Sequence, residues 1–211
     1  MELYKVMQVS CKDVENVLKN SPSGRHTDFL RAAHSLWIRF KNYEKARPYA
    51  LVQDNQIKSL IFSTFNRDGY ANLYEVVTVE GQGGYGYGHM LWETWIQIAH
   101  DAGCRRLKLS CTPESIGWHY SHGLIFWGVD KSGSLRSDQP LFPTVEKQLR
   151  YRENAIRCPR DHLPPLKQRE KFKKEISELQ FGKRKQAKVQ TAICTVCNAW
   201  LTPHLYTQED K

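Results

Sequence analysis

The sequence predicts an α/β domain, with a mixed sheet and helices on both faces, followed by a basic helical extension. Short runs of alternating apolar residues indicate strands, and apolar residues at three- and four-residue spacing indicate helices. Hairpin-compatible strands come first, and strand–helix alternation comes after them. The charge changes near residue 143, so we expect a domain over residues 1–143 and an extension over residues 144–211.

The expected elements are derived from these patterns in chain order. The first half contains a strand at 2–9, a helix at 12–19, a helix from Thr27 or Asp28 to 40, and strands at 49–53, 57–65 and 73–79. The second half contains a helix at 89–102, a strand at 106–110, a short helix at 113–121 and a strand at 124–129. Residues 132–143 are expected to form a loop, and helices are expected at 147–156 and 166–181. Asp54-Asn55 is expected to form a hairpin turn, and Gly103 is expected to cap its helix.

The composition is that of a folded protein without a membrane span. Of 211 residues, 40% are hydrophobic and 11% are aromatic, which is enough for a packed core. No run approaches about 18 uncharged apolar residues, and the N-terminus lacks the layout of a signal peptide. We therefore expect a cytoplasmic location and no membrane partner. The six cysteines are expected to be thiols or metal ligands before disulfides.

Positive charge is concentrated in the extension. The net charge is +9; residues 1–143 contain 16 Lys and Arg against 14 Asp and Glu, and residues 144–211 contain 15 against 8. A basic tail on a nearly neutral domain favours a polyanionic partner, DNA or RNA, although a long Lys-rich helix can also be a solvated face. If the tail binds nucleic acid, eight side chains are expected to contact phosphates: Arg157, Arg160, Lys167, Lys171, Lys174, Lys183, Arg184 and Lys185.

A glycine-rich segment, Gly83-Gly84-Tyr85-Gly86-Tyr87-Gly88, lies between an expected strand and an expected helix. Glycine costs backbone entropy, so this density indicates positive φ angles or the close approach of another group. The N-terminus of a helix offers unpaired N–H groups and partial positive charge, which suit a pyrophosphate. A Walker loop needs Gly-Lys-Ser/Thr and a Rossmann fingerprint needs Gly-x-Gly-x-x-Gly after the first strand, and this segment has neither. A glycine turn without a ligand is the remaining alternative.

The stretch from Leu73 to Gly128 resembles the GNAT acetyltransferase superfamily. Gly86-Tyr87-Gly88 matches the end of the family's Arg/Gln-x-x-Gly-x-Gly/Ala loop. The helix that ends before Gly103, and the strand with Leu107-Lys108-Leu109, match the helix and strand that come after that loop in the family. The resemblance implies a mostly antiparallel, twisted sheet with helices on both faces, and it implies binding of acetyl-coenzyme A (acetyl-CoA). The sequence departs from the family at Gly83, where an Arg or Gln is usual, and in a loop that is one residue shorter.

The resemblance implies which residues bind the cofactor. The N–H groups of the loop are expected to bind the pyrophosphate, and these belong to Gly84, Tyr85, Gly86, Tyr87, Gly88 and His89. Val77 and Val79 are expected to meet the pantetheine arm and the thioester carbonyl through backbone groups. Glu114 or Ser115 lies where the family often has an asparagine that touches the pantetheine.

The resemblance also implies two catalytic residues. Glu75, on the strand before the loop, is the expected base, because its apolar neighbours would raise its carboxyl pKa by desolvation; a surface glutamate is the alternative. Glu80, His89 and His119 are the reserve candidates for the base. Tyr120 matches the family's tyrosine that gives a proton to the leaving thiolate, with His119 or His122 as alternatives.

Cys194 and Cys197 form a Cys-x-x-Cys, which is half of a structural zinc site. Cys158 with His162 is one possible second pair, and His204 is another source of a ligand. Reduced thiols and a redox-active pair are the alternatives to zinc.

These features together predict an acetyl-CoA-dependent N-acyltransferase whose acceptor amine lies on a modified DNA base or a tRNA. An acceptor on a protein or a small molecule is an alternative. A non-catalytic module that binds CoA or nucleic acid is another, since the loop departs from the family's pattern at Gly83.

Overall fold

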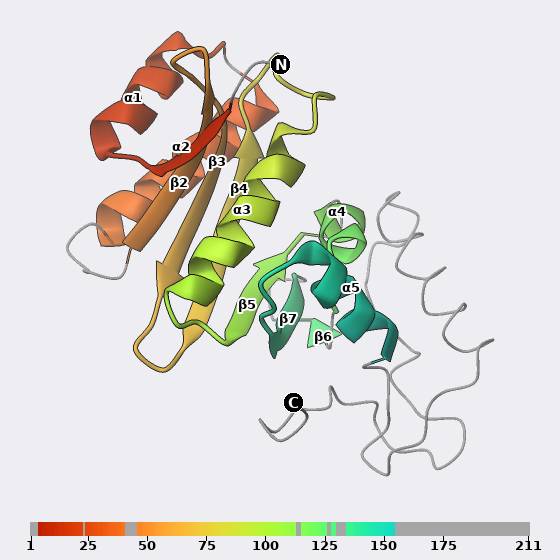
Figure 1. Ribbon diagram of the computed structural model, residues 1–211. Coiled ribbons are helices and arrows are strands. Elements are labelled where there is room, and N and C mark those ends of the chain that lie inside the picture. Colours follow the sequence, from red (N-terminus) through yellow and green to blue (C-terminus); the bar gives the residue numbers. More distant parts are fainter. Residues whose placement is uncertain are drawn as a thin grey trace. The chain divides into compact units, whose positions relative to one another are not determined.

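The computed structural model describes residues 4–22, 24–40, 46–112, 115–125, 128–129 and 134–154. The chain divides into two compact units, Met1–Arg105 and Arg106–Lys211 (Figure 1). Unit 1 contains the glycine-rich loop and Glu75, and unit 2 contains Tyr120.

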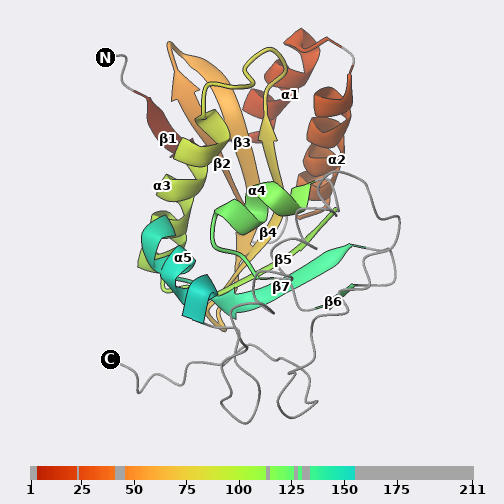
Figure 2. The same ribbon diagram turned by 90° about the vertical axis from the view of Figure 1, so that its right-hand side faces the viewer.

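Unit 1 is a four-stranded antiparallel sheet with three helices. Its strands, in sheet order, are β1 (Lys5–Gln8), β2 (Ala46–Gln53), β3 (Gln56–Phe65) and β4 (Tyr70–Thr78). Its helices are α1 (Cys11–Asn20), α2 (Arg25–Phe40) and α3 (Tyr87–Asp101), as Figure 2 shows from the side. All three pairings are antiparallel, so the predicted fold class is confirmed for this unit.

The hairpin between β2 and β3 forms at the predicted dipeptide. Asp54 and Asn55 have φ angles of 53° and 58°, and Gln53 pairs with Gln56 across them. Two consecutive positive φ angles are the geometry of a type I′ turn, whose twist matches that of the paired strands. Asp and Asn tolerate this region better than other non-glycine residues, which is why the dipeptide indicates the turn.

The two faces of the β3 strand pack against different helices. Leu60 and Phe62 lie in a buried cluster with Val14 of α1 and Leu30 of α2. Ser63, one residue further along β3, accepts a hydrogen bond of 3.0 Å from Trp95 Nε1 of α3. Successive strand residues point to opposite faces, so α1 and α2 cover one face and α3 covers the other. The helices therefore lie on both faces of the sheet, as predicted.

Helix α3 ends at the cap that the sequence indicates. Gly103 has a φ of +88°, and its N–H donates to the His100 carbonyl at 3.0 Å. Cys104 N–H reaches back to the Ala99 carbonyl, also at 3.0 Å, which completes a Schellman-type C-cap. Glycine adopts this left-handed conformation without the steric cost that a Cβ would bring.

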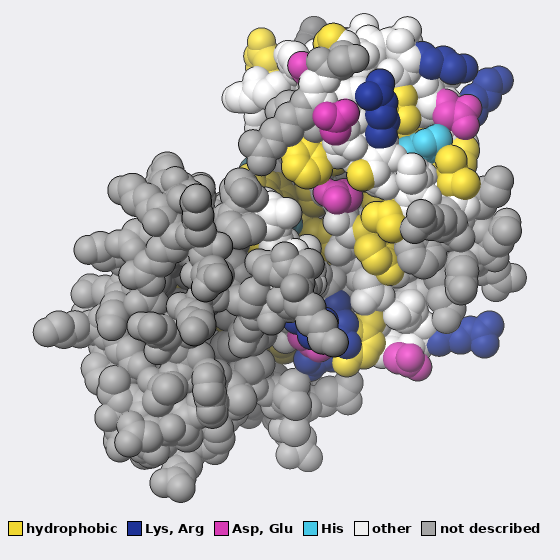
Figure 3. Space-filling model, turned by 180° about the vertical axis from the view of Figure 1, so that it is seen from behind, with side chains coloured by type: hydrophobic (Ala, Val, Ile, Leu, Met, Phe, Trp, Pro, Cys, Tyr) yellow, Lys and Arg dark blue, Asp and Glu magenta, His cyan; other side chains and the backbone are white. Residues whose placement is uncertain are grey.

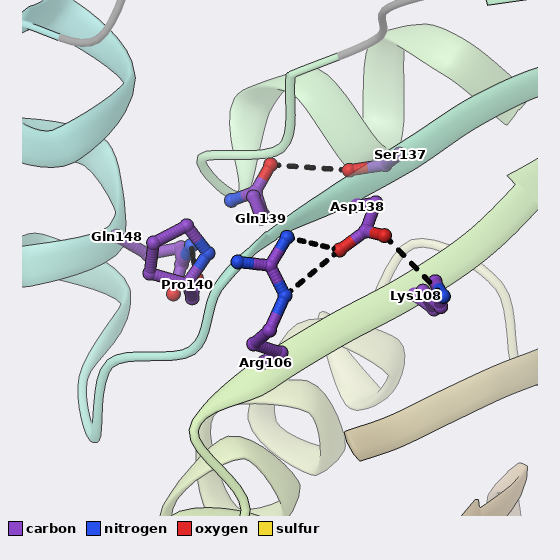
Figure 4. A network of polar contacts seen from close by, with 7 residues as sticks. All are labelled: Arg106, Lys108, Ser137, Asp138, Gln139, Pro140 and Gln148. Atoms are coloured by element: carbon purple, nitrogen blue, oxygen red, sulfur yellow. Dashed lines mark hydrogen bonds and ion pairs between the residues drawn. The ribbon is translucent and has the colours of Figure 1, made fainter. Parts of the chain in front are cut away.

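Unit 2 contains the remaining described elements. Its strands are β5 (Arg106–Cys111), β6 (Gly128–Val129) and β7 (Leu135–Pro140), and its helices are α4 (Ile116–Ser121) and α5 (Val145–Asn154). Strand β7 lies between β5 and β6 and is antiparallel to both. Asp138 of β7 pairs with Arg106 and with Lys108 of β5, as Figure 4 shows.

The structure corrects three expectations from the sequence. The prediction of a loop over 132–143 is wrong at 135–140, because these residues form β7. Its sequence is polar because its buried residues, Ser137 and Gln139, are polar side chains that form hydrogen bonds. Of the described residues of the strand expected at 124–129, 128–129 form β6, whereas Leu124 and Ile125 lie outside a strand and Ile125 N–H donates to the Gln139 side chain at 2.7 Å. Helix α2 begins at Arg25, ahead of Thr27, whose hydroxyl donates to the Pro22 carbonyl.

Helix α5 packs on the described part of unit 2. Gln148 donates to the Pro140 carbonyl at 2.9 Å and accepts from Phe142 N–H at 3.0 Å, and Tyr151 packs on Phe142 with ring centroids 5.5 Å apart. The division between residues 143 and 144 stays a prediction, since residues 155–211 lie outside the described part. Among the described helices, none has the length and apolar character needed to cross a membrane.

We predict that Gly123→Ala destabilises the protein more than Gly103→Ala does. Both glycines have positive φ, so both variants lose roughly 1 kcal/mol from backbone strain. A Cβ at Gly123 would also lie 2.7 Å from the backbone of Gln148, whereas nothing lies within 4 Å of a Cβ at Gly103. Overpacking adds roughly 1–3 kcal/mol, which thermal unfolding of the two variants will measure. Equal losses would show that α5 does not approach this turn so closely.

Candidate functional site

The glycine loop joins the end of β4 to the start of α3. Gly81, Gly84 and Gly86 have φ angles of 79°, 85° and 77°, which explains the glycine density. Gln82 N–H donates to the Val79 carbonyl at 3.0 Å and turns the chain. A Cβ at Gly83, Gly84 or Gly86 would meet no other atom within 4 Å. The surface of the loop is therefore open to the approach of a ligand.

The first turn of α3 lacks the acidic residue that the first turns of α1, α2 and α5 have. Its N-cap, Gly86, makes no side-chain hydrogen bond, and the first turn of α3 contains no acidic residue. By contrast, the first turns of α1, α2 and α5 contain Asp13, Asp28 and Glu146. The partial positive charge at the start of α3 is therefore not offset by an acidic side chain of its own first turn, which favours an external anion there.

Glu80 connects the loop to the start of α2. Its Oε2 accepts a hydrogen bond of 3.2 Å from Thr27 Oγ1, and Thr27 is only 1% exposed. A Cβ on Gly24 would lie 2.8 Å from Glu80 Oε1, so this carboxylate packs closely on the turn between α1 and α2. Glu80 is held as a structural anchor of the loop, which makes it a poor candidate for a catalytic base.

Tyr85 and Tyr87 form an aromatic pair on the loop. Their ring centroids are 5.6 Å apart, and Tyr85 is 68% exposed. His89, one turn into α3, pairs with Glu93 at 3.2 Å. An exposed aromatic ring beside an anion-binding helix end can pack on the apolar part of a ligand.

A bulge in β4 determines which face Glu75 occupies. Phe62 pairs with Glu75, but Ser63 pairs with Leu73, so Tyr74 is an extra residue. Phe62 belongs to the cluster under α1 and α2, and Glu75 therefore points to the same face. Burial raises the pKa of the Glu75 carboxyl from 4.5 to about 7, the direction that the sequence predicts. This carboxyl can accept or release a proton near neutral pH.

The hydrogen bonds of β4 show which residues direct backbone groups away from β3. Val79 N–H donates to the Lys58 carbonyl at 2.9 Å, and the Val77 carbonyl accepts a bond of 3.0 Å from Ser59 Oγ. In an antiparallel pair, residues alternate between facing the partner strand and facing away from it. Val76 and Thr78 therefore direct their N–H and carbonyl groups toward the edge of β4 opposite to β3.

A cavity of about 640 Å³ lies beside the start of the loop. Val79, Glu80 and Gln82 form one wall, and the side of α1 that carries Asp13 and Asn16 forms another. None of its described lining residues is Lys or Arg. Hydrogen bonds from Ser10 hold the pKa of Asp13 below its usual value, so this wall keeps a negative charge, which disfavours a phosphate. On the face of the molecule seen in Figure 3, hydrophobic and charged side chains are mixed among the described residues.

In unit 2, Tyr120 lies on α4. Three other residues that the sequence indicates, His119, His122 and Ser115, lie on α4 or next to its ends. Tyr120 is half-buried, and the Arg152 guanidinium carbon lies 4.3 Å from its ring centroid. Burial lowers the pKa of His119 to about 3, so this imidazole is neutral and weakly basic. His122 Nδ1 is 2.6 Å from the Trp118 carbonyl, which fixes that ring. Ser115 Oγ donates to the Thr112 carbonyl at 3.1 Å.

Solved structures with the same fold include a PaiA N-acetyltransferase from Thermoplasma acidophilum in complex with coenzyme A. It has a TM-score of 0.53 and 12% identity, over 65% of this chain and 99% of that one. An acetyltransferase from Thermus thermophilus has a TM-score of 0.53 and 19% identity, over 67% and 100%. Spermidine N-acetyltransferase from Vibrio cholerae has a TM-score of 0.51 and 10% identity, over 65% and 94%. No protein-family model and no curated protein matches the sequence.

The chain has the GNAT acetyltransferase fold. In unit 1, the GNAT loop residues Gly84 to His89 lie together at the start of α3, directly after the strand that carries Glu75. The expectation for Val77 and Val79 is corrected: their backbone groups face β3, because strand parity could not be derived without the register. The backbone groups of Val76 and Thr78 face away from β3.

Other site expectations fall in unit 2 or outside the described residues. Tyr120 and Ser115 are in unit 2, and Glu114 is not described. The cysteines at 194 and 197 and all eight basic candidates from Arg157 to Lys185 also lie outside the described part. Within the described ranges, Cys11, Cys104 and Cys111 form no disulfide, and no three potential metal ligands gather.

Two contacts of the candidate site residues could not be predicted from the sequence. The pairing of Glu80 with Thr27 joins residues 53 positions apart, and no local pattern indicates such a contact. Arg152 belongs to the basic residues of 144–211, and its guanidinium lies on the ring of Tyr120. An isolated Arg between charged residues on a polar helix gives no signal of that role.

Proposed function

We propose that the protein is an acetyl-CoA-dependent N-acyltransferase. The observation that supports this most directly is the start of α3 in a GNAT fold. The loop before it is built from positive-φ glycines, and its first turn has neither a side-chain cap nor an acid. Those features suit a pyrophosphate, and they would be unfavourable for a helix end that had no anion to bind.

The residues of unit 1 fit the cofactor in two places. The backbone N–H groups from Gly84 to His89 would hold the pyrophosphate. Gly84 and Gly86 have no side chain, so a ligand can approach the backbone there closely. Val76 and Thr78 would pair with the pantetheine arm along the outer edge of β4, as one strand pairs with another. When bound, acetyl-CoA supplies an acyl group that is already activated as a thioester.

Glu75 is the proposed general base. A protonated amine cannot attack a thioester carbon, so a neighbouring group must take up the proton of the amine, directly or through a water. A carboxyl with a pKa of about 7 is better matched to that task than one with an ordinary pKa. Tyr120 is the proposed proton donor to the sulfur as the carbon–sulfur bond breaks and the nitrogen–carbon bond forms.

We predict that Gly86→Asp weakens binding of coenzyme A at least tenfold relative to Gly86→Asn. Both residues tolerate the left-handed φ of +77° at this position, and they have nearly the same shape. Only Asp adds a negative charge at the helix end, where it would compete with the pyrophosphate; the estimate of about tenfold corresponds to roughly 1.4 kcal/mol. Calorimetric titration with coenzyme A measures the two dissociation constants. Equal affinities would rule out this loop as the phosphate site.

We predict that Glu75→Gln lowers kcat by about 100-fold or more at pH 8 and removes its dependence on pH near 7. In the native protein, the base acts when ionised, so kcat rises with pH through about 7 and then levels off. The release of the thiol from acetyl-CoA, with tRNA or a free diamine as the acyl acceptor and followed between pH 5.5 and 9, gives both profiles. Binding of coenzyme A is the control and should be unchanged. A full rate in the Gln variant would eliminate Glu75 as the base.

For the acceptor, we propose an amine on a nucleic acid, a modified DNA base or a tRNA. The support is the excess of positive charge in residues 144–211, 15 Lys and Arg against 8 Asp and Glu. Neutralising phosphates releases counterions, so such binding weakens steeply with salt.

The acceptor proposal is tested with variants of the full chain. Replacing Lys183, Arg184 and Lys185 together by Gln should reduce the salt dependence of DNA or tRNA binding, lowering the log–log slope by roughly 2–3. Replacing three lysines of unit 1, Lys5, Lys12 and Lys19, by Gln removes the same charge and is the control. Acetylated nucleosides should appear, by mass spectrometry, in cells that express the native protein. If only proteins or small amines are acetylated, the nucleic-acid acceptor is wrong.

The cavity beside the loop supports a second candidate acceptor, a small cationic amine. Its walls carry the carboxylates of Asp13 and Glu80 and several side-chain amides, within a volume typical of ligand pockets. Acetylation of free diamines by the purified protein, abolished by Asp13→Asn, would favour this acceptor over the nucleic acid.

A further inference from the structure

A side chain from α5 contacts Tyr120 at two points. The Arg152 guanidinium carbon lies 4.3 Å from the centroid of the Tyr120 ring. Arg152 Nη1 also donates a hydrogen bond to the backbone carbonyl of Tyr120. A planar guanidinium can stack on a ring and donate in its own plane at the same time, which a lysine ammonium cannot do. The guanidinium of Arg152 thus contacts both the ring and the backbone of Tyr120.

The helix that carries Arg152 is itself fixed close to α4. Figure 4 shows Gln148 against Pro140, and the Gln148 side chain bonds both the Pro140 carbonyl and Phe142 N–H. Tyr151, next to Arg152, is buried on Phe142 and Ile125. The backbone of Gln148 also approaches Gly123 so closely that a Cβ would lie 2.7 Å away. The base of the Arg152 side chain therefore has little freedom to move relative to α4.

The C-terminal end of α4 is held by a buried polar network. Gln139 of β7 donates to the Gly123 carbonyl at 3.0 Å and accepts from Ile125 N–H at 2.7 Å. Gln139 is fully buried, so breaking either bond would leave a buried polar group unsatisfied. Gly123 N–H in turn donates to the Tyr120 carbonyl, which also accepts from Arg152. Backbone and ring of Tyr120 are therefore fixed through β7 and α5 together.

Other charged groups of unit 2 have different partners in the described part. Asp138 is bound by Arg106 and Lys108, and Glu146 pairs with Arg150 on the exposed side of α5. His119 and His122, which flank Tyr120 on α4, are buried. Arg150 thus offers a control on the same helix, with the same charge and an exposed side chain.

We propose that Arg152 is a positioning residue for Tyr120. This rests on the proposed function, in which the Tyr120 hydroxyl gives a proton to the leaving sulfur. A proton donor must keep its oxygen within hydrogen-bond distance of the acceptor atom, and a phenol moves its oxygen whenever the side chain tilts. By holding the ring from its face and the backbone from its carbonyl, Arg152 limits that tilt.

The test is a double-mutant cycle on the full chain. Arg152→Gln should lower kcat for thiol release from acetyl-CoA by about threefold to tenfold, with KM for acetyl-CoA unchanged. This fold-change corresponds to the interaction energy of a cation–π contact. In a Tyr120→Phe background, the same substitution should cost nothing further, because the residue that it positions has lost its function. Arg150→Met should change neither parameter. Independent, multiplicative losses from Arg152→Gln and Tyr120→Phe would overturn the proposal.

A spectroscopic signature tests the contact without turnover. In protein with ring-labelled tyrosine, the Tyr120 signal is the one that Tyr120→Phe removes. It should shift in Arg152→Gln and stay in place in Arg150→Met. If the Gln variant does not fold, Arg152→Lys, which keeps the charge but cannot stack and donate together, should shift the same signal and lower kcat. An unmoved signal would overturn the proposal, whereas absence of turnover in the native protein would reject the acyltransferase function alone.

Discussion

The packing of α3 against the sheet is the constraint on which the proposed cofactor site depends. Trp92 and Trp95 are fully buried on this helix, and each large aromatic contributes roughly 2–3 kcal/mol by its burial. The hydrogen bond from Trp95 Nε1 to Ser63 Oγ connects α3 to β3. A shift of α3 along its own axis would break this bond and leave the buried Trp95 N–H without an acceptor. The start of α3 is thereby held at the end of β4. The glycines need only turn the chain between two ends that are already fixed.

The glycine loop lies between a helix end with partial positive charge and a cavity wall with negative charge. The start of α3 has no acidic residue in its first turn, whereas the cavity beside Val79 and Gln82 carries the carboxylates of Asp13 and Glu80. An anion is favoured on one side of the loop and a cation on the other. Glu80 belongs to both the loop and the cavity wall, and Thr27 and Gly24 hold its carboxylate in place.

Local chemistry could be predicted from the sequence wherever one residue type has a specific backbone role. Asp54-Asn55 and Gly103 indicated their turn and cap because few residues adopt positive φ without cost. The raised pKa of Glu75 could be derived from its apolar neighbours on the strand. The bulge at Tyr74 could not be predicted, since it depends on the register with β3, and the same register decides that Val76 and Thr78, rather than Val77 and Val79, face outward. The bulge and the direction of these backbone groups depend on how β3 and β4 pair, and the periodicity of one strand does not determine that pairing.

Strand β7 was not predicted from the sequence for a related reason, whereas helix α5 was predicted at 147–156 and forms at Val145–Asn154. The strand buries Ser137 and Gln139 and the helix buries Gln148, so positions that periodicity expects to be apolar are occupied by polar side chains. These side chains are satisfied by backbone groups of the α4–β6 segment and of residues 140–142, which no local pattern could supply. A buried, satisfied polar network specifies one arrangement more narrowly than apolar contacts do, because each misplaced partner leaves an unpaired group. A segment that resembles the start of a charged tail is thus bonded into the fold that holds Tyr120.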